Sequence, residues 1–486
     1  MSGRPVAFLG IDIGSSELRA GLVTADGRLL GLERATHEMT VDPGRGWAEQ
    51  DPDAWWIGLV KVVAALQSRG DIEIAGIAVD GHGPTMVAVD AHGRSVRPAI
   101  TWLDQRAGAE QAELEAGAGL HGWSLGVLPA ALWLERNEPE SAALASWYLN
   151  TWEAMTLRLT GVARTSLVGD QAWMSRAVVE SLGIQGSRIA ESVAAGSVVG
   201  PLSVDAGRAL GLSGGIPVIA GVVDAFASFH GGRMLAPGDA IDVGGSAGGF
   251  GVYSDRSVVA AGSFSTAAPL EGLFSVGGAM AATGKALDWL RTAVLSGNVG
   301  VDDLIREAAD VPAGADGLIF LPYLAGERSP IWDPEARGAF VGLTLQAGRA
   351  HLARAVLEAS ALAIRHVAAP ILAAGVQVNA MRVAGGPARS QTWNQIKADI
   401  TGFPVEVPRI VETAVAGSAI LAAVGVGAHP DLRSGIRAMT AIDARLEPDP
   451  ERAATYDRTY AAYAAIHPAL SPILEAYRSR DLEPVS

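Results

Sequence analysis

The N-terminal hydrophobic pattern consists of three short apolar runs that tight turns separate. Each run has the length of a β-strand, and the turns contain Gly14 or Asp26-Gly27, so the pattern predicts an antiparallel meander. The three runs cover residues 6–12, 18–24 and 29–35. Apolar positions then recur at helical spacing over residues 55–68, directly after Asp51-Pro52-Asp53, which is a typical helix start.

A related pattern returns in the second half of the chain. An apolar run over residues 240–243 leads into a glycine turn, and a strand is predicted over 250–253. Ile-Asp-Ile-Gly-Ser-Ser at 11–16 therefore has a counterpart in Ile-Asp-Val-Gly-Gly-Ser at 241–246, about half the chain away. This similarity favours duplication of one α/β unit, although a similarity this short also arises by chance.

The remaining pattern alternates further strands and helices. Strands are predicted over 72–80, 86–89, 217–223, 318–322 and 381–384, and helices over 224–230, 349–368 and 451–478, the last interrupted near Pro468. Gly231-Gly232 and Pro237-Gly238 mark a boundary, which predicts domains over 1–236 and 237–486. The apolar stretch 413–428 is interpreted as a buried helix, because a membrane span needs about 20 apolar residues.

Composition narrows the class of protein. The net charge of −15 argues against a partner such as duplex DNA or an anionic membrane, because phosphate contacts need a basic face. The absence of cysteine excludes disulfides, thiolate metal sites and a cysteine nucleophile. The N-terminal apolar run contains Asp12 and has no signal-peptide pattern, so we expect a cytoplasmic protein.

The turn after residue 12 is the first candidate site. Its backbone N–H groups and hydroxyls suit a phosphate, and Asp12 beside it suits a hydrated Mg²⁺. An ordinary hairpin turn fits the same residues. The second copy favours phosphate, because two such turns facing one cleft can hold one polyphosphate.

Two other residues are candidate catalytic groups. Asp224 follows an apolar strand at a helix start, which fits a helix N-cap and a general base at a strand end about equally well. Ser246 lies in Gly244-Gly245-Ser246-Ala247-Gly248, which matches the nucleophile elbow of serine hydrolases. That elbow should open a helix, whereas a strand is predicted here, so a serine hydrolase is the second hypothesis. A non-catalytic nucleotide-binding regulator is the third.

Several motifs in one order carry a family resemblance. They are residues 46–52 (GWAEQDP), 97–106 (RPAITWLDQR), 326–330 (GERSP) with 333–338 (DPEARG), and Gly385-Gly386 followed by Trp393-Asn394-Gln395. Over residues 6–445 the chain resembles the FGGY carbohydrate kinases, nearest to their xylulokinase-like members.

The resemblance implies a fold, a donor and site residues. The implied fold is α/β, with two similar actin-like, ribonuclease-H-like domains and ATP, with Mg²⁺, in the cleft between them. The implied catalytic residues are Asp224 and Asp12, with Asp12 also holding Mg²⁺ through water. The implied ATP and phosphate contacts are Gly14, Ser15, Ser16, Arg19, Gly245, Ser246, Gly284, Gly386 and Ser390. The implied sugar contacts are His82, Gly83, Pro84, Trp102, Asp104 and Asp224.

Two departures from the family pattern bear on the substrate and the phosphate site. The family usually has threonine where this chain has Gly245, so we expect Ser246 to supply the hydroxyl. Xylulokinases have a histidine where this chain has Pro84, which puts D-xylulose in doubt. A ketopentose is the first expectation, and another ketose or a polyol of the ribulose, fuculose, erythritol or glycerol type stays open. A homodimer also stays open.

Overall fold

The computed structural model describes residues 4–42, 44–117, 125–167, 176–245 and 247–480. The chain divides into two compact units. Unit 1 comprises Met1–Leu235, Thr266–Leu273 and Glu412–Ala441, and unit 2 comprises Ala236–Ser265, Phe274–Val411 and Ile442–Ser486.

The main sheet of unit 1 has six strands in the order β12-β13-β6-β1-β2-β3. Its strands are β1 (Val6–Ile13), β2 (Glu17–Val23), β3 (Leu29–Thr36), β6 (Glu73–Gly81), β12 (Val198–Pro201) and β13 (Pro217–Ile219). β1, β2 and β3 form the predicted antiparallel meander, and β1, β6 and β13 run parallel. The expected N-terminal strands are therefore confirmed.

Unit 2 repeats this arrangement of strand directions. Six neighbouring strands of its sheet run in the order β17-β15-β14-β20-β21-β22. They are β14 (Asp239–Asp242), β15 (Gly248–Ser254), β17 (Phe274–Met280), β20 (Ala380–Val383), β21 (Val405–Pro408) and β22 (Ile442–Leu446). Antiparallel pairs flank the parallel strands β14, β20 and β21, as in unit 1. The short internal similarity therefore marks a duplicated α/β unit, as the sequence favours.

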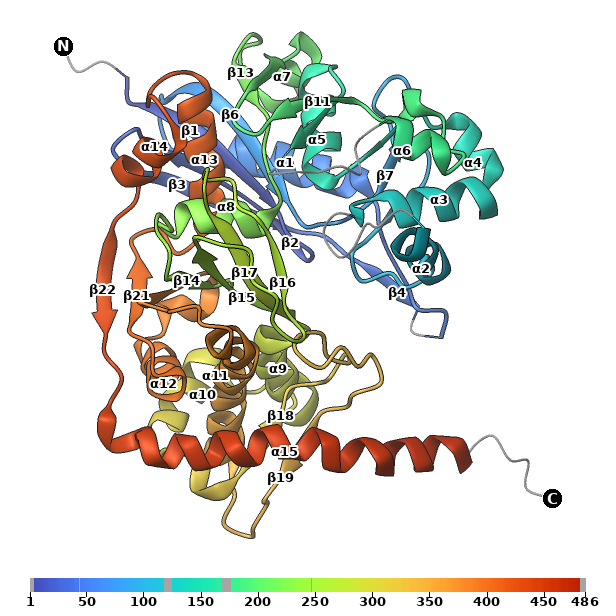
Figure 1. The fold of residues 1–486 in the computed structure, drawn as a ribbon. Coiled ribbons are helices and arrows are strands. Elements are labelled where there is room, and N and C mark those ends of the chain that lie inside the picture. The colour runs from blue at the N-terminus through green and yellow to red at the C-terminus, as the bar shows by residue number, and fades with distance from the viewer. Residues whose placement is uncertain (1–3, 43, 118–124, 168–175, 246, 481–486) are drawn as a thin grey trace. The chain divides into compact units, whose positions relative to one another are not determined.

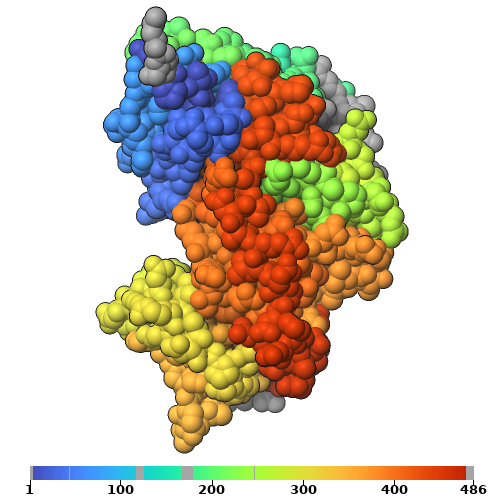
Figure 2. Space-filling model, turned by 90° about the vertical axis from the view of Figure 1, so that its left-hand side faces the viewer, coloured from blue at the N-terminus to red at the C-terminus, as the bar shows by residue number. Residues whose placement is uncertain are grey.

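Helix α13 (Thr413–Gly425) belongs to unit 1 although it comes late in the chain. It packs on β1, on β6 and on α8 (Asp224–Gly231), and Figures 1 and 2 show it beside the N-terminal strands. The approach is close, since a Cβ on Gly10 would lie 2.1 Å from the carbonyl oxygen of Val415. Almost all of α13 is buried, so the expected core helix is confirmed.

Unit 1 also contains helices and short strands outside its main sheet. They are β4 (Thr40–Asp42), β5 (Trp47–Gln50), α1 (Pro52–Gln67), β7 (Val87–Val89), β8 (Ala99–Ile100), α2 (Gly108–Gly117), α3 (Leu128–Asn137), α4 (Pro139–Leu144), β9 (Trp147–Leu149), α5 (Thr151–Thr160), β10 (Arg164–Leu167), α6 (Arg176–Ser181), β11 (Glu191–Ala194), α7 (Val204–Leu210) and α14 (Leu432–Met439).

The helices of unit 2 share one apolar core. They are α9 (Thr283–Trp289), α10 (Val301–Ala309), α11 (Arg349–Ala373), α12 (Gln391–Thr401) and α15 (Pro450–Arg480), with the short strands β18 (Ile319–Leu321) and β19 (Ala339–Val341). By length and composition α11 could cross a membrane, but 72% of its apolar window is buried inside the protein. This burial identifies α11 as the central core helix of the unit.

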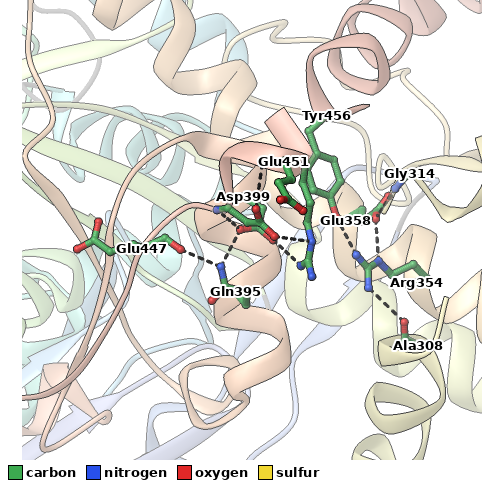
Figure 3. Close-up of polar contacts among 11 residues, drawn as sticks. Ala308, Gly314, Arg354, Glu358, Gln395, Asp399, Glu447, Glu451 and Tyr456 are labelled. Atoms are coloured by element: carbon green, nitrogen blue, oxygen red, sulfur yellow. Dashed lines mark hydrogen bonds and ion pairs between the residues drawn. The ribbon is translucent and has the colours of Figure 1, made fainter. Parts of the chain in front are cut away.

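A buried polar cluster fastens α15 to α11 (Figure 3). Arg354 donates to Glu358 at 2.7 Å and to the hydroxyl of Tyr456 at 2.7 Å, and that hydroxyl donates to Glu358 at 3.0 Å. Glu358 also accepts from the backbone N–H of Gly314 at 3.0 Å. The cluster ties α15 to the core where the helix begins.

The expected interruption near Pro468 is wrong. α15 continues through both Pro468 and Pro472 as one helix. Each proline removes one backbone hydrogen bond. Both prolines are exposed, so water can reach this stretch of backbone and bond to the freed carbonyls.

Candidate active site

Three aspartates gather at the carboxyl ends of the parallel strands of unit 1. Asp12 and Asp80 are direct partners in the β1–β6 ladder. Asp224 follows Val223, which bridges to Gly81 just beyond Asp80. In open α/β sheets this edge is where ligands bind.

The carboxyls of Asp12 and Asp80 are both buried. Asp12 pairs with Arg19 at 2.9 Å, and Asp80 accepts from the hydroxyl of Ser418 at 2.5 Å. Burial raises the pKa of Asp12, against the charge of Arg19. Burial raises the pKa of Asp80 well above its usual range, and the charges of Asp12 and Asp224 raise it further. Asp80 therefore keeps its proton to a higher pH than an ordinary carboxyl does. Arg19 donates to the carboxylates of Asp12 and Glu17, which belong to unit 1.

Asp12 fits a hydrated Mg²⁺ ion. One of its oxygens, Oδ2, is paired with Arg19, whereas buried Oδ1 has no hydrogen-bond partner among the described residues. Among the described residues, no three His, Cys, Asp or Glu side chains are grouped so that they could hold a metal ion. The site therefore suits an ion that is held mostly by water and phosphates, which is the preference of Mg²⁺.

Asp224 is the first residue of α8. The N-cap position is Val223, so the N-cap interpretation of Asp224 is wrong. Its Oδ1 accepts from the backbone N–H of Ala225 at 2.7 Å, and its side chain is half-buried. This position is compatible with a general base that reaches a substrate at the strand ends.

The structure brings three of the predicted phosphate and sugar residues together. Trp102 donates from its indole to the hydroxyl of Ser15 at 3.0 Å, and its backbone N–H donates to the Thr85 hydroxyl at 3.3 Å. His82 bonds through Nδ1 to the same hydroxyl at 2.8 Å. Burial lowers the pKa of His82 to about 3, with a smaller contribution from His37, so the ring is neutral near pH 7. Its Nε2 has no hydrogen-bond partner among the described residues.

The other predicted sugar contacts differ in burial and in the hydrogen bonds that they already make. Both carboxylate oxygens of Asp104 are occupied, because they accept from Arg106 at 2.7–2.9 Å and from the N–H of Ala48 at 2.6 Å. Gly83 packs against Trp152, and Pro84 is half-buried. Direct contact of Asp104 with sugar stays a prediction, and it would require sharing these oxygens.

The remaining turn residues of unit 1 lie in the β1–β2 hairpin. Gly14 donates to the carbonyl of Glu17 at 3.0 Å, which closes the turn. Ser16 is exposed, and its carbonyl accepts from the N–H of His37 at 3.1 Å. Phosphate binding by Gly14, Ser15 and Ser16 stays a prediction.

Unit 2 has a pocket beside the second glycine turn. Gly244, Gly245, Gly284 and Thr283 contribute to its lining, together with the buried ion pair of Asp242 and Lys397. Two predicted nucleotide contacts, Gly245 and Gly284, therefore lie on one pocket. Ser246 lies outside the described residues, and strand β15 follows it, not the helix that a serine nucleophile elbow needs.

Gly386 and Ser390 flank this pocket without lining it. Between them, Pro387 does contribute to the lining. Ser390 is the N-cap of α12, where its hydroxyl accepts from the N–H of Trp393 at 3.2 Å. That hydroxyl therefore caps α12, and its contact with adenosine stays a prediction.

Sequence reasoning missed Asp80, Lys397 and Thr283 as candidates. Asp80 ends an apolar strand, as Asp12 does, and that similarity is the signal that marks it. Lys397 lies in a helix far along the chain from Asp242, so only the fold brings the two together.

Two family models match this chain. The N-terminal domain model of the FGGY family of carbohydrate kinases matches residues 7–231, and the C-terminal domain model matches residues 242–426. This chain belongs to the FGGY family of carbohydrate kinases. As an FGGY kinase it is an ATP-dependent enzyme that phosphorylates a carbohydrate, and the resemblance seen in its sequence is confirmed.

Individual relatives match nearly the whole FGGY kinase chain. It is 30% identical to the xylulose kinase of Escherichia coli K12, over 96% of this chain and 100% of that protein. It is 29% identical to glycerol kinase 2 of Streptomyces coelicolor, over 90% of this chain and 93% of that protein. The crystal structure of a xylulose kinase from Rhodospirillum rubrum matches with a TM-score of 0.79 and 31% identity, over 96% of this chain and all of that one.

Proposed function

We propose that this kinase transfers the γ-phosphate of ATP to a primary hydroxyl of a ketopentose. The position of Asp224, near the buried Asp80 at the carboxyl ends of the unit 1 strands, supports the proposal. The xylulose kinases among its relatives favour a ketopentose. Because ATP is the donor, we place the reaction in the cytoplasm.

Asp224 acts as the general base. It accepts the proton of the sugar hydroxyl while the hydroxyl oxygen forms a bond to the γ-phosphorus. The bond from that phosphorus to the β–γ bridging oxygen breaks, and ADP leaves with the electron pair. The protein catalyses phosphoryl transfer mainly by positioning the reactants and stabilising the charge of the transition state. Mg²⁺, held through water by Asp12, would neutralise phosphate charge.

Unit 1 holds the sugar in this proposal. His82 is neutral, so it offers a sugar hydroxyl a hydrogen bond and no charge. Trp102 is held by Ser15 and Thr85 and supplies a flat apolar face for the carbon skeleton. In unit 2, the pocket beside Gly245 and Gly284 takes part of a phosphate group of the nucleotide.

A polyol is the second candidate acceptor. Pro84 has no hydrogen-bonding side chain where the xylulokinase pattern has histidine, so one contact typical of xylulose is missing. A glycerol kinase is also among the relatives. These two observations favour a smaller acceptor with fewer polar contacts.

One screen separates the candidates. ADP release is measured with ATP, Mg²⁺ and a panel of ketopentoses, ketohexoses, aldoses and polyols. The proposal predicts the highest kcat/KM with a ketopentose. A higher value with a polyol would replace the ketopentose by the second candidate, and no response to any acceptor would contradict both.

A further inference from the structure

A lysine is buried against the pocket of unit 2. Lys397 lies on α12 and is 2% exposed, and its ammonium donates to Asp242 Oδ2 at 2.5 Å. An ammonium carries three N–H donors. Asp242 is its one hydrogen-bond partner among the described residues, which leaves two donors at the wall of the pocket.

The surroundings of this lysine suit an anion. Of the described residues that line the pocket, Lys397 bears the only positive charge. Gly244, Gly245 and Thr283 line the same pocket, and the N–H of Gly244 already donates to the carbonyl of Asp242 at 2.9 Å. A backbone N–H of the turn, such as that of Gly245, the Thr283 hydroxyl and the Lys397 ammonium are donor types that typically bind phosphate together.

A purely structural ion pair is the alternative explanation. Burying a charged pair costs desolvation free energy. Apolar residues of similar volume often stabilise a fold as much as a buried ion pair does, so stability alone does not explain the pair. The chain also uses lysine sparingly, since Lys61, Lys285 and Lys397 are the only lysines among its 37 basic residues. Lys61 and Lys285 are exposed. The single buried lysine therefore lies where a compact point charge suits a phosphate.

We propose that Lys397 is a nucleotide-binding residue whose ammonium, besides its bond to Asp242, donates to a phosphate oxygen of the bound nucleotide. The inference rests on the proposed ATP-dependent function and assigns a phosphate contact within it. Because Asp242 competes for the same ammonium, the two members of the pair act on nucleotide affinity in opposite directions. A structural clamp makes the opposite prediction, since loss of either member disturbs the pocket alike.

The experiment measures ADP binding by calorimetry and adenosine binding by competition. Lys397→Met keeps the length of the side chain and removes its charge, and it should weaken ADP about tenfold to a hundredfold while changing adenosine less than about threefold. Asp242→Asn should leave ADP affinity unchanged or tighten it. Lys61→Met, an exposed lysine of unit 1, is the control and should change neither ligand.

A double variant keeps the test possible if Lys397→Met does not fold. If Lys397→Met does not fold because Asp242 is left uncompensated, the double variant Asp242→Asn with Lys397→Met removes both charges and should show the same selective loss of ADP. Equal losses of ADP and adenosine, or weaker ADP binding in Asp242→Asn, would overturn the inference and leave the proposed function intact. A wild-type protein that does not bind ADP would overturn both.

Discussion

Asp80 lies opposite Asp12 in the β1–β6 ladder, close enough for the charge of Asp12 to raise its pKa. Because burial favours the protonated, neutral form of Asp80, a neutral amide should replace it well. Asp80→Asn can accept from Ser418 and donate toward Asp12, so its free energy of unfolding should stay within about 1 kcal/mol of the wild type.

Asp80→Leu is the contrasting variant. It leaves the Ser418 hydroxyl without its acceptor and places an apolar side chain beside the buried carboxyl of Asp12, which should cost about 1–3 kcal/mol for each group. Urea unfolding at pH 7 compares the two variants. Equal destabilisation by Asn and Leu would show that Asp80 is not held protonated.

Ser15 should affect the sugar more than ATP. Its hydroxyl accepts from the indole of Trp102, so Ser15→Ala frees the ring that we place against the sugar. Loss of one hydrogen bond of about 1 kcal/mol should raise the sugar KM about fivefold, with the KM for ATP nearly unchanged. Steady-state kinetics with each substrate varied provide the measurement, with exposed Ser213→Ala as the control. A rise confined to the KM for ATP would instead support the phosphate contact that the sequence predicts.

Glu327 should make stability depend on pH. It is buried and accepts from the N–H groups of Ala281 and Arg328, and burial raises its pKa from 4.5 to about 7. The folded protein keeps this proton up to about pH 7, whereas the unfolded chain releases it near pH 4.5. The stabilisation is therefore complete below pH 4.5 and is lost as the pH rises through about 7.

Glu327→Gln tests this dependence. The amide has no proton to lose and still accepts at Oε1, so the variant should match the wild type at pH 4.5. At pH 8 it should be more stable by up to about 3 kcal/mol. Urea unfolding at both pH values measures the difference, with exposed Glu335→Gln as the control. An identical difference at the two pH values would refute the shifted pKa.

The Arg354–Glu358–Tyr456 cluster should be costly to break. Glu358→Ala leaves a buried guanidinium, the N–H of Gly314 and the Tyr456 hydroxyl without their shared partner (Figure 3). We expect a loss of about 3–5 kcal/mol in the free energy of unfolding. Arg349→Ala on the same helix breaks an exposed pair with Glu307 and should change stability little. Similar losses in the two variants would contradict an anchoring role.

The sequence predicted what depends on local pattern and failed where distant segments meet. Alternating apolar runs located β1, β2 and β3, and the repeated Asp-x-Gly turn indicated the duplication that the two sheets share. Burial of Asp80 depends on α13, which follows more than 300 residues later, so a strand pattern cannot reveal it. The partnership of Lys397 with Asp242 has the same cause.

Local pattern also does not reveal which side-chain atoms the fold already occupies. Asp104 lies in a motif typical of the family, yet its oxygens are bound by Arg106 and Ala48. Ser390 begins a helix, so its hydroxyl caps that helix. In both cases the hydrogen bonds that hold the local structure occupy atoms that the motif assigns to a ligand.

The role of Asp224 as general base is tested by the kcat of Asp224→Asn with the best sugar of the enzyme. The amide keeps the size of the side chain but cannot accept the hydroxyl proton, so kcat should fall about 10²- to 10⁴-fold while ADP binding stays within about twofold of the wild type. Exposed Asp205→Asn, also in unit 1, should leave both unchanged. A kcat within about threefold of the wild type in Asp224→Asn would show that Asp224 is not the general base.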